Sequence, residues 1–221
     1  MTAENTYQIA NTILSEPRME RLYHAARELF RPMDRAAHNW EHVERVILNS
    51  VAVGVPENAD MSIVMAATIL HDLGYVTNPE DPPNHPINGA ERCYEHLGEW
   101  TPADREAIAQ CIMKHKGAYP GYSFFPETLE EQVVCDADQL DKFGWVGFIQ
   151  MVKVYVEHGF KGRAPYHTLA GIAEGMTHLN AIEFYTRTAR DLAADRTEPD
   201  TQAVAEAFRN ELRFYEEWNR P

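Results

Sequence analysis

A helical repeat of apolar residues runs through almost the whole sequence, and it limits the fold more than any other feature. Apolar side chains recur every three or four positions in successive segments, as at Ile63, Ala66, Ala67 and Leu70. This spacing places them on one face of an α-helix, whereas a half-buried strand needs apolar and polar residues to alternate. No convincing alternating run of β-branched residues occurs. The sequence therefore predicts an all-α protein built as a helical bundle.

Start and stop signals divide this pattern into separate helices. Asp60 and Thr101 are expected N-caps, and Thr128 begins a capping box. Gly54 and Pro56 are expected to end the helix before Asp60, because both residues disfavour a helix interior. Helices are predicted over residues 17–30, 35–53, 60–70, 101–116, 128–140, 145–158, 168–194 and 199–218, with a proline-rich loop over residues 75–86.

The charge balance excludes one class of partner. Lys and Arg number 20 and Asp and Glu number 34, so the formal net charge is −14. A surface this acidic repels phosphate backbones, so we expect no binding to a nucleic-acid duplex. A small anionic substrate remains compatible with this charge, because bound metal ions can reverse the sign locally.

The lack of a visible targeting signal and the spacing of the cysteines favour a cytoplasmic location. The N-terminal residues lack a basic region followed by an apolar core, and the longest apolar run, residues 63–70, is too short to span a bilayer. Cys93, Cys111 and Cys135 are widely spaced and form no CxxC pair, which favours buried, reduced thiols. We therefore expect a cytoplasmic protein with no membrane partner.

Acidic and imidazole side chains stand at the ends or edges of several apolar helical patterns. A single histidine in such a place is more often a hydrogen-bonded core residue than a ligand. His71 and Asp72 differ, because a buried carboxylate costs several kcal/mol unless an Arg or a metal ion compensates it. The adjacent imidazole favours the metal. Further candidates of this kind are His42, His85, His115 and Asp138.

Four separated phrases place these residues in a known order. They are His42-Val43 with Arg45 and Val46, LHDLG at residues 70–74, His85 followed by Gly89-Ala90, and DADQLD at residues 136–141. In this order they resemble the HD-domain superfamily of metal-dependent phosphohydrolases, and most of all its small stand-alone bacterial members. The resemblance covers roughly residues 36–148. It implies one HD domain over residues 1–221, with C-terminal helices from 149–221 packing on the core motif region.

The resemblance also implies a ligand set. His42, His71, Asp72 and Asp138 are expected to bind one divalent metal, with Asp72 able to bridge to a second. Mixed imidazole and carboxylate ligands suit Mn, Fe, Co, Ni or Zn, whereas Mg and Ca prefer oxygen alone. Asp136 and Asp138 face different ways on a helix, so only one is expected to be a ligand. Asp138 is the choice, because the family's acid precedes x-Leu.

Histidines between the His-Asp pair and the last Asp bind a second metal in dinuclear family members, and His85 and His115 hold such positions. The alternative for His85 is a solvated loop residue, and for His115 a contact to substrate phosphate without metal. Lys116, beside His115, is the first candidate among the lysines for a phosphate contact. Catalytic roles are thus expected for Asp72, His115 and Lys116.

Two further residues keep open interpretations. His38 lies one turn before His42 and could face the same cavity or the surface. Arg45 matches the family's Arg, yet it could simply pair with Glu41 at the surface.

The implied function is hydrolysis of a nucleotide or another small phosphate ester by a metal-activated water. The alternative is a di-iron oxygenase, since some HD-fold proteins use dioxygen on a small polar substrate. Lyase or hydratase chemistry is a further option. A non-catalytic binding module is disfavoured, because such modules lose part of the ligand set. The acidic, aromatic residues 211–218 are expected to form a helix that closes the bundle or a contact in a homodimer.

Overall fold

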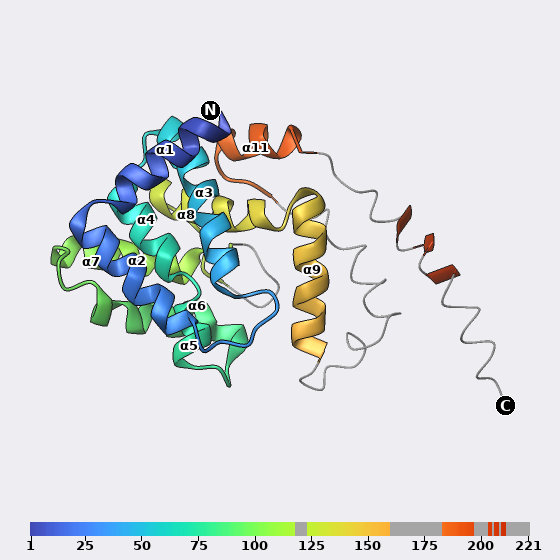
Figure 1. Cartoon of the computed structure of the whole chain (residues 1–221), viewed down its shortest axis with the longest axis horizontal. Helices are drawn as coiled ribbons and strands as arrows, with labels where there is room; N and C mark the ends of the chain where they lie inside the picture. The colour runs from blue at the N-terminus through green and yellow to red at the C-terminus, as the bar shows by residue number, and fades with distance from the viewer. Residues whose placement is uncertain (118–122, 160–182, 197–202, 205, 208, 211–221) are drawn as a thin grey trace. The chain divides into compact units, whose positions relative to one another are not determined.

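The computed structural model describes residues 1–117, 123–159, 183–196, 203–204, 206–207 and 209–210. Regular structure in these residues is helical throughout, without a strand (Figure 1), which confirms the predicted all-α class. Among them, no helix is both long and apolar enough to cross a membrane. The elements are α1 (Ala3–Leu14), α2 (Pro17–Phe30), α3 (Trp40–Glu57), α4 (Met61–Leu70), α5 (Leu73–Thr77), η1 (Pro82–Asn84), α6 (His85–Arg92), η2 (Cys93–His96), α7 (Pro102–Lys114), α8 (Leu129–Asp141), α9 (Gly144–Gly159) and α11 (Arg187–Ala194).

The chain divides into two compact units. The first contains residues 1–34, 38–141 and 184–191, and the second contains residues 35–37, 142–183 and 192–221. All the predicted metal ligands belong to the first unit. The expectation of one domain, with residues 149–221 packing on residues 36–148, stays a prediction.

Helix α4 lies at the centre of the first unit. Its residues from Val64 to Leu70 are all buried, as expected for a helix that is apolar on every side. It packs against α3, α7 and α8, and α3 also packs along α8 (Figure 1). Because α4 is enclosed in this way, its C-terminal end delivers His71 and Asp72 into the interior.

The predicted helix starts are confirmed where the cap is a local side-chain bond. Asp60 accepts a hydrogen bond from the backbone of Ser62 at 2.9 Å, and Thr101 accepts one from Asp104 at 3.2 Å. In the capping box, Thr128 Oγ1 accepts from the Glu131 backbone at 3.3 Å, and Glu131 Oε2 accepts from the Thr128 backbone at 3.1 Å. The sequence missed helix α1 at the N-terminus, which Thr2 caps.

The predicted bounds of the second helix, 35–53, are wrong at both ends. Helix α3 begins only at Trp40, where the Asn39 side chain accepts a hydrogen bond from the backbone of His42 at 3.2 Å. It then continues through Gly54 and Pro56 and ends at Asn58, whose φ of 60° closes the helix in the left-handed region. Gly54 serves packing, since a Cβ there would lie 2.7 Å from Met61 Sδ.

The predicted loop over residues 75–86 is also wrong for most of its length. Helix α5 continues to Thr77, and the prolines at 82 and 86 open η1 and the first turn of α6. Proline suits the first turn of a helix, because its missing N–H would have no partner there. His85 is therefore the first residue of α6 and only 5% exposed, rather than a solvated loop residue.

The last two predicted helices lie largely outside the described residues. Of the range 168–194, the structure describes α11 and residues 183–186, which are not helical. Of the range 199–218, it describes residues 203–204, 206–207 and 209–210, which are helical.

The described part of the second unit centres on α9. Glu157 on this helix accepts hydrogen bonds from Arg35 Nη1 at 2.8 Å and from the backbone of Ala37 at 2.9 Å. Gln150 Nε2 donates to the Ala37 carbonyl at 2.7 Å. These bonds fasten residues 35–37 to α9 within the same unit.

Candidate metal centre

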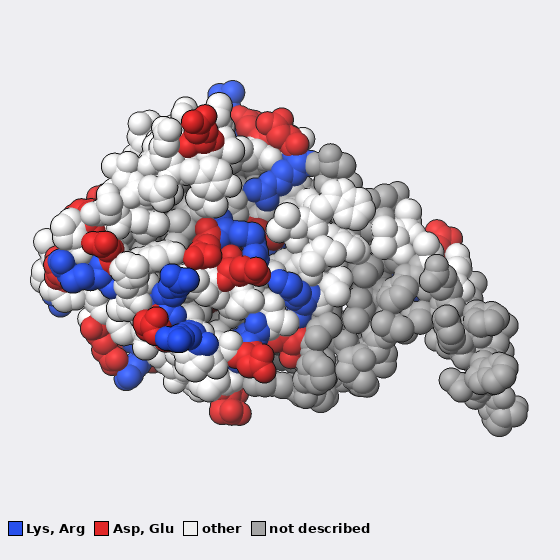
Figure 2. Space-filling model, viewed as in Figure 1, with Lys and Arg blue, Asp and Glu red and all other residues white. Residues whose placement is uncertain are grey.

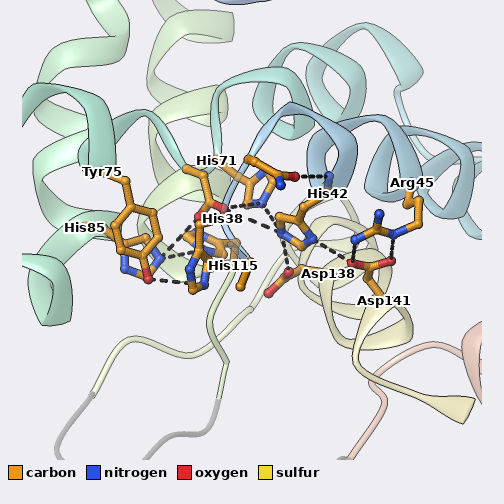
Figure 3. A network of polar contacts seen from close by, with 12 residues as sticks. His38, His42, Arg45, His71, Tyr75, His85, His115, Asp138 and Asp141 are labelled. Carbon is orange, nitrogen blue, oxygen red and sulfur yellow. Dashed lines mark hydrogen bonds and ion pairs between the residues drawn. The ribbon is translucent and has the colours of Figure 1, made fainter. Parts of the chain in front are cut away.

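Six side chains converge in the first unit from helices far apart in the sequence (Figure 3). They come from α3, the junction of α4 and α5, the start of α6, the end of α7, and α8. Each is at most 5% exposed, so the cluster lies almost entirely below the surface. The six are the ligands predicted from the sequence: His42, His71, Asp72, His85, His115 and Asp138.

Three of the four histidines are oriented by the same local bond. In each, Nδ1 lies within hydrogen-bond distance of the backbone carbonyl three residues earlier. The distances are 2.7 Å from His71 to Thr68, 2.8 Å from His85 to Pro82, and 2.6 Å from His115 to Ile112. A carbonyl only accepts, so Nδ1 must carry the hydrogen, and the other ring nitrogen, Nε2, is left to face the cluster.

His42 reaches the same orientation through a carboxylate. Its Nδ1 lies 2.7 Å from Asp141 Oδ2, and Arg45 donates to the two oxygens of Asp141 from Nε at 2.6 Å and Nη2 at 2.9 Å. The contact of Arg45 with Glu41 is longer, at 3.8 Å. Arg45 therefore serves this bridge, which Figure 3 shows beside His42, rather than only a surface pair.

The inward-facing nitrogens meet in two pairs. His42 Nε2 lies 3.1 Å from His71 Nε2, and His85 Nε2 lies 3.2 Å from His115 Nε2. Two unprotonated nitrogens this close repel each other unless a proton or a cation lies between them. Two nitrogen ligands of one transition-metal ion, each about 2.1 Å from it, are separated by about 3.0–3.4 Å. Each pair thus has the spacing of ligands that share an ion.

Asp72 turns one carboxylate oxygen toward each pair. Its Oδ2 lies 3.4 Å from His71 Nε2 and 3.6 Å from His42 Nε2, and its Oδ1 lies 3.5 Å from His85 Nε2 and 3.9 Å from His115 Nε2. Within the described part of the chain, the buried Oδ2 has no hydrogen-bond donor. A buried, unsatisfied carboxylate oxygen is costly, and a metal ion would satisfy it.

The cluster therefore consists of two ligand groups that share Asp72. Asp138 Oδ1 lies 3.3 Å from His42 Nε2 and so belongs beside the first pair. Within each triad of two histidines and Asp72, the ligand atoms all lie within 4.8 Å of one another. We name His42, His71, Asp72 and Asp138 the first ligand group, and Asp72, His85 and His115 the second.

The choice of Asp138 over Asp136 agrees with the geometry. Asp136 accepts hydrogen bonds from the backbones of Tyr185 at 2.8 Å and Thr186 at 2.7 Å, and from the Thr186 hydroxyl at 2.7 Å. These bonds hold residues 184–191 on α8. Asp136 is therefore a structural anchor, and Asp138 is the carboxylate that the helix turns to the histidines.

The pKa values of the cluster residues indicate which part of the cluster favours a positive charge. Burial would lower the pKa of His42, but hydrogen bonds to Asp138 and Asp141 outweigh burial and raise it to about 10. Burial, together with the charge of His71, lowers the pKa of His115 to about 4, and burial also lowers that of His85. Burial would raise the pKa of Asp72, yet the neighbouring histidines, His71 first, hold it below its usual value. A cation at the first ligand group would meet this demand.

Other predicted residues lie at the edge of the cluster. Lys116 Nζ donates to the Pro83 carbonyl at 3.4 Å, and its contact with a phosphate stays a prediction. His38 faces the cluster side: its ring centroid lies 4.3 Å from that of Tyr75, and its Nε2 lies 3.3 Å from the Tyr75 hydroxyl. Tyr75 in turn stacks on His85, with centroids 4.1 Å apart and an interplanar angle of 17° (Figure 3).

Sequence reasoning missed Tyr75 and Asp141. A signal for each was present, since Tyr75 follows Asp72 by three residues and Asp141 follows Asp138 by three. Residues three apart on a helix lie on the same side, so each could have been expected near its ligand.

An all-α fold in which separated histidines meet a His-Asp pair and a later Asp defines a class of helical domains whose buried cluster could hold a metal ion. The comparisons give that class its name. Residues 39–142 match the family described as the HD domain, which confirms the resemblance to the HD-domain superfamily over this part of the chain.

The relatives carry little functional information. The uncharacterized protein YpgQ of Bacillus subtilis is 28% identical over 181 residues, which cover 74% of this chain and 79% of YpgQ. A predicted HD superfamily hydrolase from an uncultured Thermotogales bacterium has a similar fold, with a TM-score of 0.61, 24% identity, and coverage of 94% of this chain and 98% of that one. The crystal structure of YpgQ in complex with ADP matches with a TM-score of 0.56 and 24% identity, over 88% of this chain and 95% of that one.

Proposed function

We propose that this protein is a metal-dependent phosphohydrolase that cleaves a nucleotide or another small phosphate ester. One observation carries the proposal: two pairs of histidines point Nε2 at Nε2 across 3.1 and 3.2 Å and share Asp72. Backbone carbonyls fix the orientation of three of the four rings, which supports a site built to present Nε2.

The first ligand group would hold a divalent transition metal, with two imidazoles and two carboxylates as its ligands. The bound metal would supply an activated water and withdraw negative charge from the phosphoryl oxygens. Asp72 and Asp138 would balance the charge of the ion. The lowered pKa of His115, about 4, keeps this ring neutral at pH 7, so it offers a lone pair rather than a positive charge to whatever lies beside Asp72.

The choice of substrate class has two supports. With a net charge of −14, the protein needs a local cation to attract a phosphate, and the six-residue cluster could hold one. Red acidic and blue basic side chains are interspersed on the face of Figure 2, among the residues coloured there. In addition, the relative YpgQ has been crystallised with ADP, which makes nucleoside phosphates the first compounds to test.

The second ligand group is also compatible with the alternative function, a di-iron oxygenase. His85 and His115, 3.2 Å apart and beside Asp72, offer the two nitrogens and the shared carboxylate that a second iron would need. A hydrolase and a di-iron oxygenase could therefore share this ligand set.

The test is a screen on purified full-length protein stripped with chelator and reloaded with Mn, Co, Ni, Fe or Ca. We expect release of phosphate or pyrophosphate from nucleoside phosphates with the transition metals and little with Ca. The His71→Ala variant is the control for contaminating phosphatase. Release equal to that of this control in every combination would overturn the proposal, and dioxygen consumption by the iron-loaded protein would favour the oxygenase.

A further inference from the structure

We infer that Asp141, held by Arg45, is a positioning residue for His42 and makes the first ligand group the tighter of two metal positions. The inference rests on the proposed metal centre, and it adds an order of filling and names the residue responsible.

The four histidines differ in what accepts their Nδ1 hydrogen. His71, His85 and His115 donate to neutral backbone carbonyls, whereas His42 donates to the carboxylate of Asp141 at 2.7 Å. A negatively charged acceptor pushes electron density toward the opposite ring nitrogen and makes the imidazole a stronger ligand. His42 Nε2 is therefore the strongest metal ligand of the four imidazoles, and it belongs to the first ligand group.

Arg45 makes this arrangement rigid. Asp141 is only 2% exposed, and the guanidinium spans both of its oxygens from Nε and Nη2. This two-bond geometry leaves the carboxylate one orientation. Oδ2 is then turned to His42, and the His42 ring cannot flip without losing the bond.

The bridge is also in register with the ligands on both helices. Arg45 follows His42 by one turn on α3, and Asp141 follows Asp138 by one turn on α8. The ion pair of Arg45 with Asp141 thus fixes the spacing of the two helices that bring His42 and Asp138 together. Such a bridge supports ligand placement as well as ring orientation.

The second ligand group has no equivalent support among the described residues. His85 and His115 rest on neutral carbonyls, and the neighbour of His85 is the stacked ring of Tyr75. The carboxylate of this group is Asp72, which it shares with the first group. An ion bound there meets fewer charges and weaker nitrogen ligands, so the second position fills at higher metal concentration.

The experiment compares two substitutions on α8 in the full-length protein. Asp141→Asn replaces the bridging carboxylate with an amide of the same shape. Asp136→Asn is the matched control, because Asp136 is also a buried carboxylate on α8 that accepts three hydrogen bonds, yet it contacts Tyr185 and Thr186 instead of the ligands. Mn²⁺ binding to chelator-treated protein is measured by calorimetry, and the rise in melting temperature on adding Mn²⁺ is measured alongside.

We expect Asp141→Asn to weaken the tight Mn²⁺ step about tenfold to a hundredfold and to shrink the metal-induced rise in melting temperature, while the weak step changes little. Asp136→Asn should lower the melting temperature but leave both affinities at their wild-type values. If Asp141→Asn does not fold, Arg45→Met is measured instead and should weaken the same step.

Unchanged tight binding in the variant, or a loss confined to the weak step, would overturn the inference. Wild-type protein that binds no Mn²⁺, Co²⁺ or Ni²⁺ would instead overturn the proposed function, so the two failures are distinguishable.

Discussion

His85 Nε2 and His115 Nε2 lie 3.2 Å apart, although each ring already donates its Nδ1 hydrogen to a backbone carbonyl. Neither ring can donate to the other unless it becomes positively charged, and burial lowers the pKa of both. While both rings are neutral, the pair could therefore hold a cation between the two nitrogens but not a hydrogen bond. Asp72 lies between the two pairs of histidines, and each of its two oxygens faces one pair. A cation beside either pair would therefore also contact Asp72.

Asp72→Ala is expected to abolish stoichiometric metal binding while α4 remains folded. Asp72 belongs to both ligand groups, so its loss removes a ligand from each metal position. Metal content by elemental analysis should fall to near zero, and the metal-induced rise in melting temperature should disappear. Asp34→Ala, at an exposed position in the same unit, is the control. Wild-type metal affinity in Asp72→Ala would show that the ligands are assigned wrongly.

His115→Ala should keep the first metal and lose the second, with turnover falling on the order of a hundredfold. His85→Ala should have the same selective effect on metal binding, because both residues belong only to the second ligand group. His24→Ala, on an exposed position of α2, serves as the control for removing an imidazole. The measurement is metal stoichiometry against metal concentration. Loss of both metals together in either variant would contradict the division into two groups.

Gly74→Ala should damage the second ligand group through the backbone. A Cβ at Gly74 would overlap the carbonyl of His85, because α5 and α6 approach each other closely there. Relieving that overlap must shift the start of α6, so we expect a loss of at least about 3 kcal/mol in unfolding free energy. Urea denaturation measures the loss, and calorimetry should show that the second metal binds more weakly. Gly98→Ala, where the added Cβ meets nothing within 4 Å, is the control.

The unfolding free energy of the chelated protein should be greatest near pH 6.5. Below that pH, His115 with its pKa lowered to about 4, and His85 with a lowered pKa, bind fewer protons when folded than when unfolded, so stability falls as pH falls from 6.5 toward 4. Above it, the raised pKa of His42 acts in the opposite sense. The contribution of His42 to the unfolding free energy is fully present below pH 6.5 and is lost as the pH rises through about 10.

Urea denaturation across pH 4–10 in the presence of chelator checks this dependence. Stability that rises steadily from pH 6.5 to 10 would contradict the ionisation described for His42.

The parts of the fold that depend on neighbouring residues could be predicted from the sequence. The N-caps at Asp60 and Thr101 are bonds within one turn, and the structure contains them as expected. The end of α3 could not be predicted, because Gly54 lies within the helix, where it leaves room for Met61 of another helix. The error at residues 75–86 has a local cause, because prolines there stand in the first turns of helices, where they are tolerated, instead of excluding helices.

Some residues of the candidate site could also be predicted from the sequence, and others could not. Its six predicted ligands stand in sequence motifs that resemble a known family, so they could be proposed from the amino-acid sequence alone, and the structure brings the six side chains together. Asp141 and Tyr75 act through contacts made between helices, α3 with α8 and α5 with α6, and no local pattern encodes those contacts. The sequence showed both residues at helical spacing from a ligand but could not show which way they turn.

Anomalous diffraction from crystals of the full-length protein grown with saturating Mn²⁺ tests the metal centre most directly. We expect one strong peak bounded by His42, His71, Asp72 and Asp138, and a second peak of lower occupancy between Asp72, His85 and His115. The two peaks should be about 3.5–4 Å apart, as in other two-metal sites that share a carboxylate. A single peak at the first ligand group would exclude a second metal position, and the proposal would then be a hydrolase with one metal ion. Diffraction with no anomalous peak at these six residues would contradict the account.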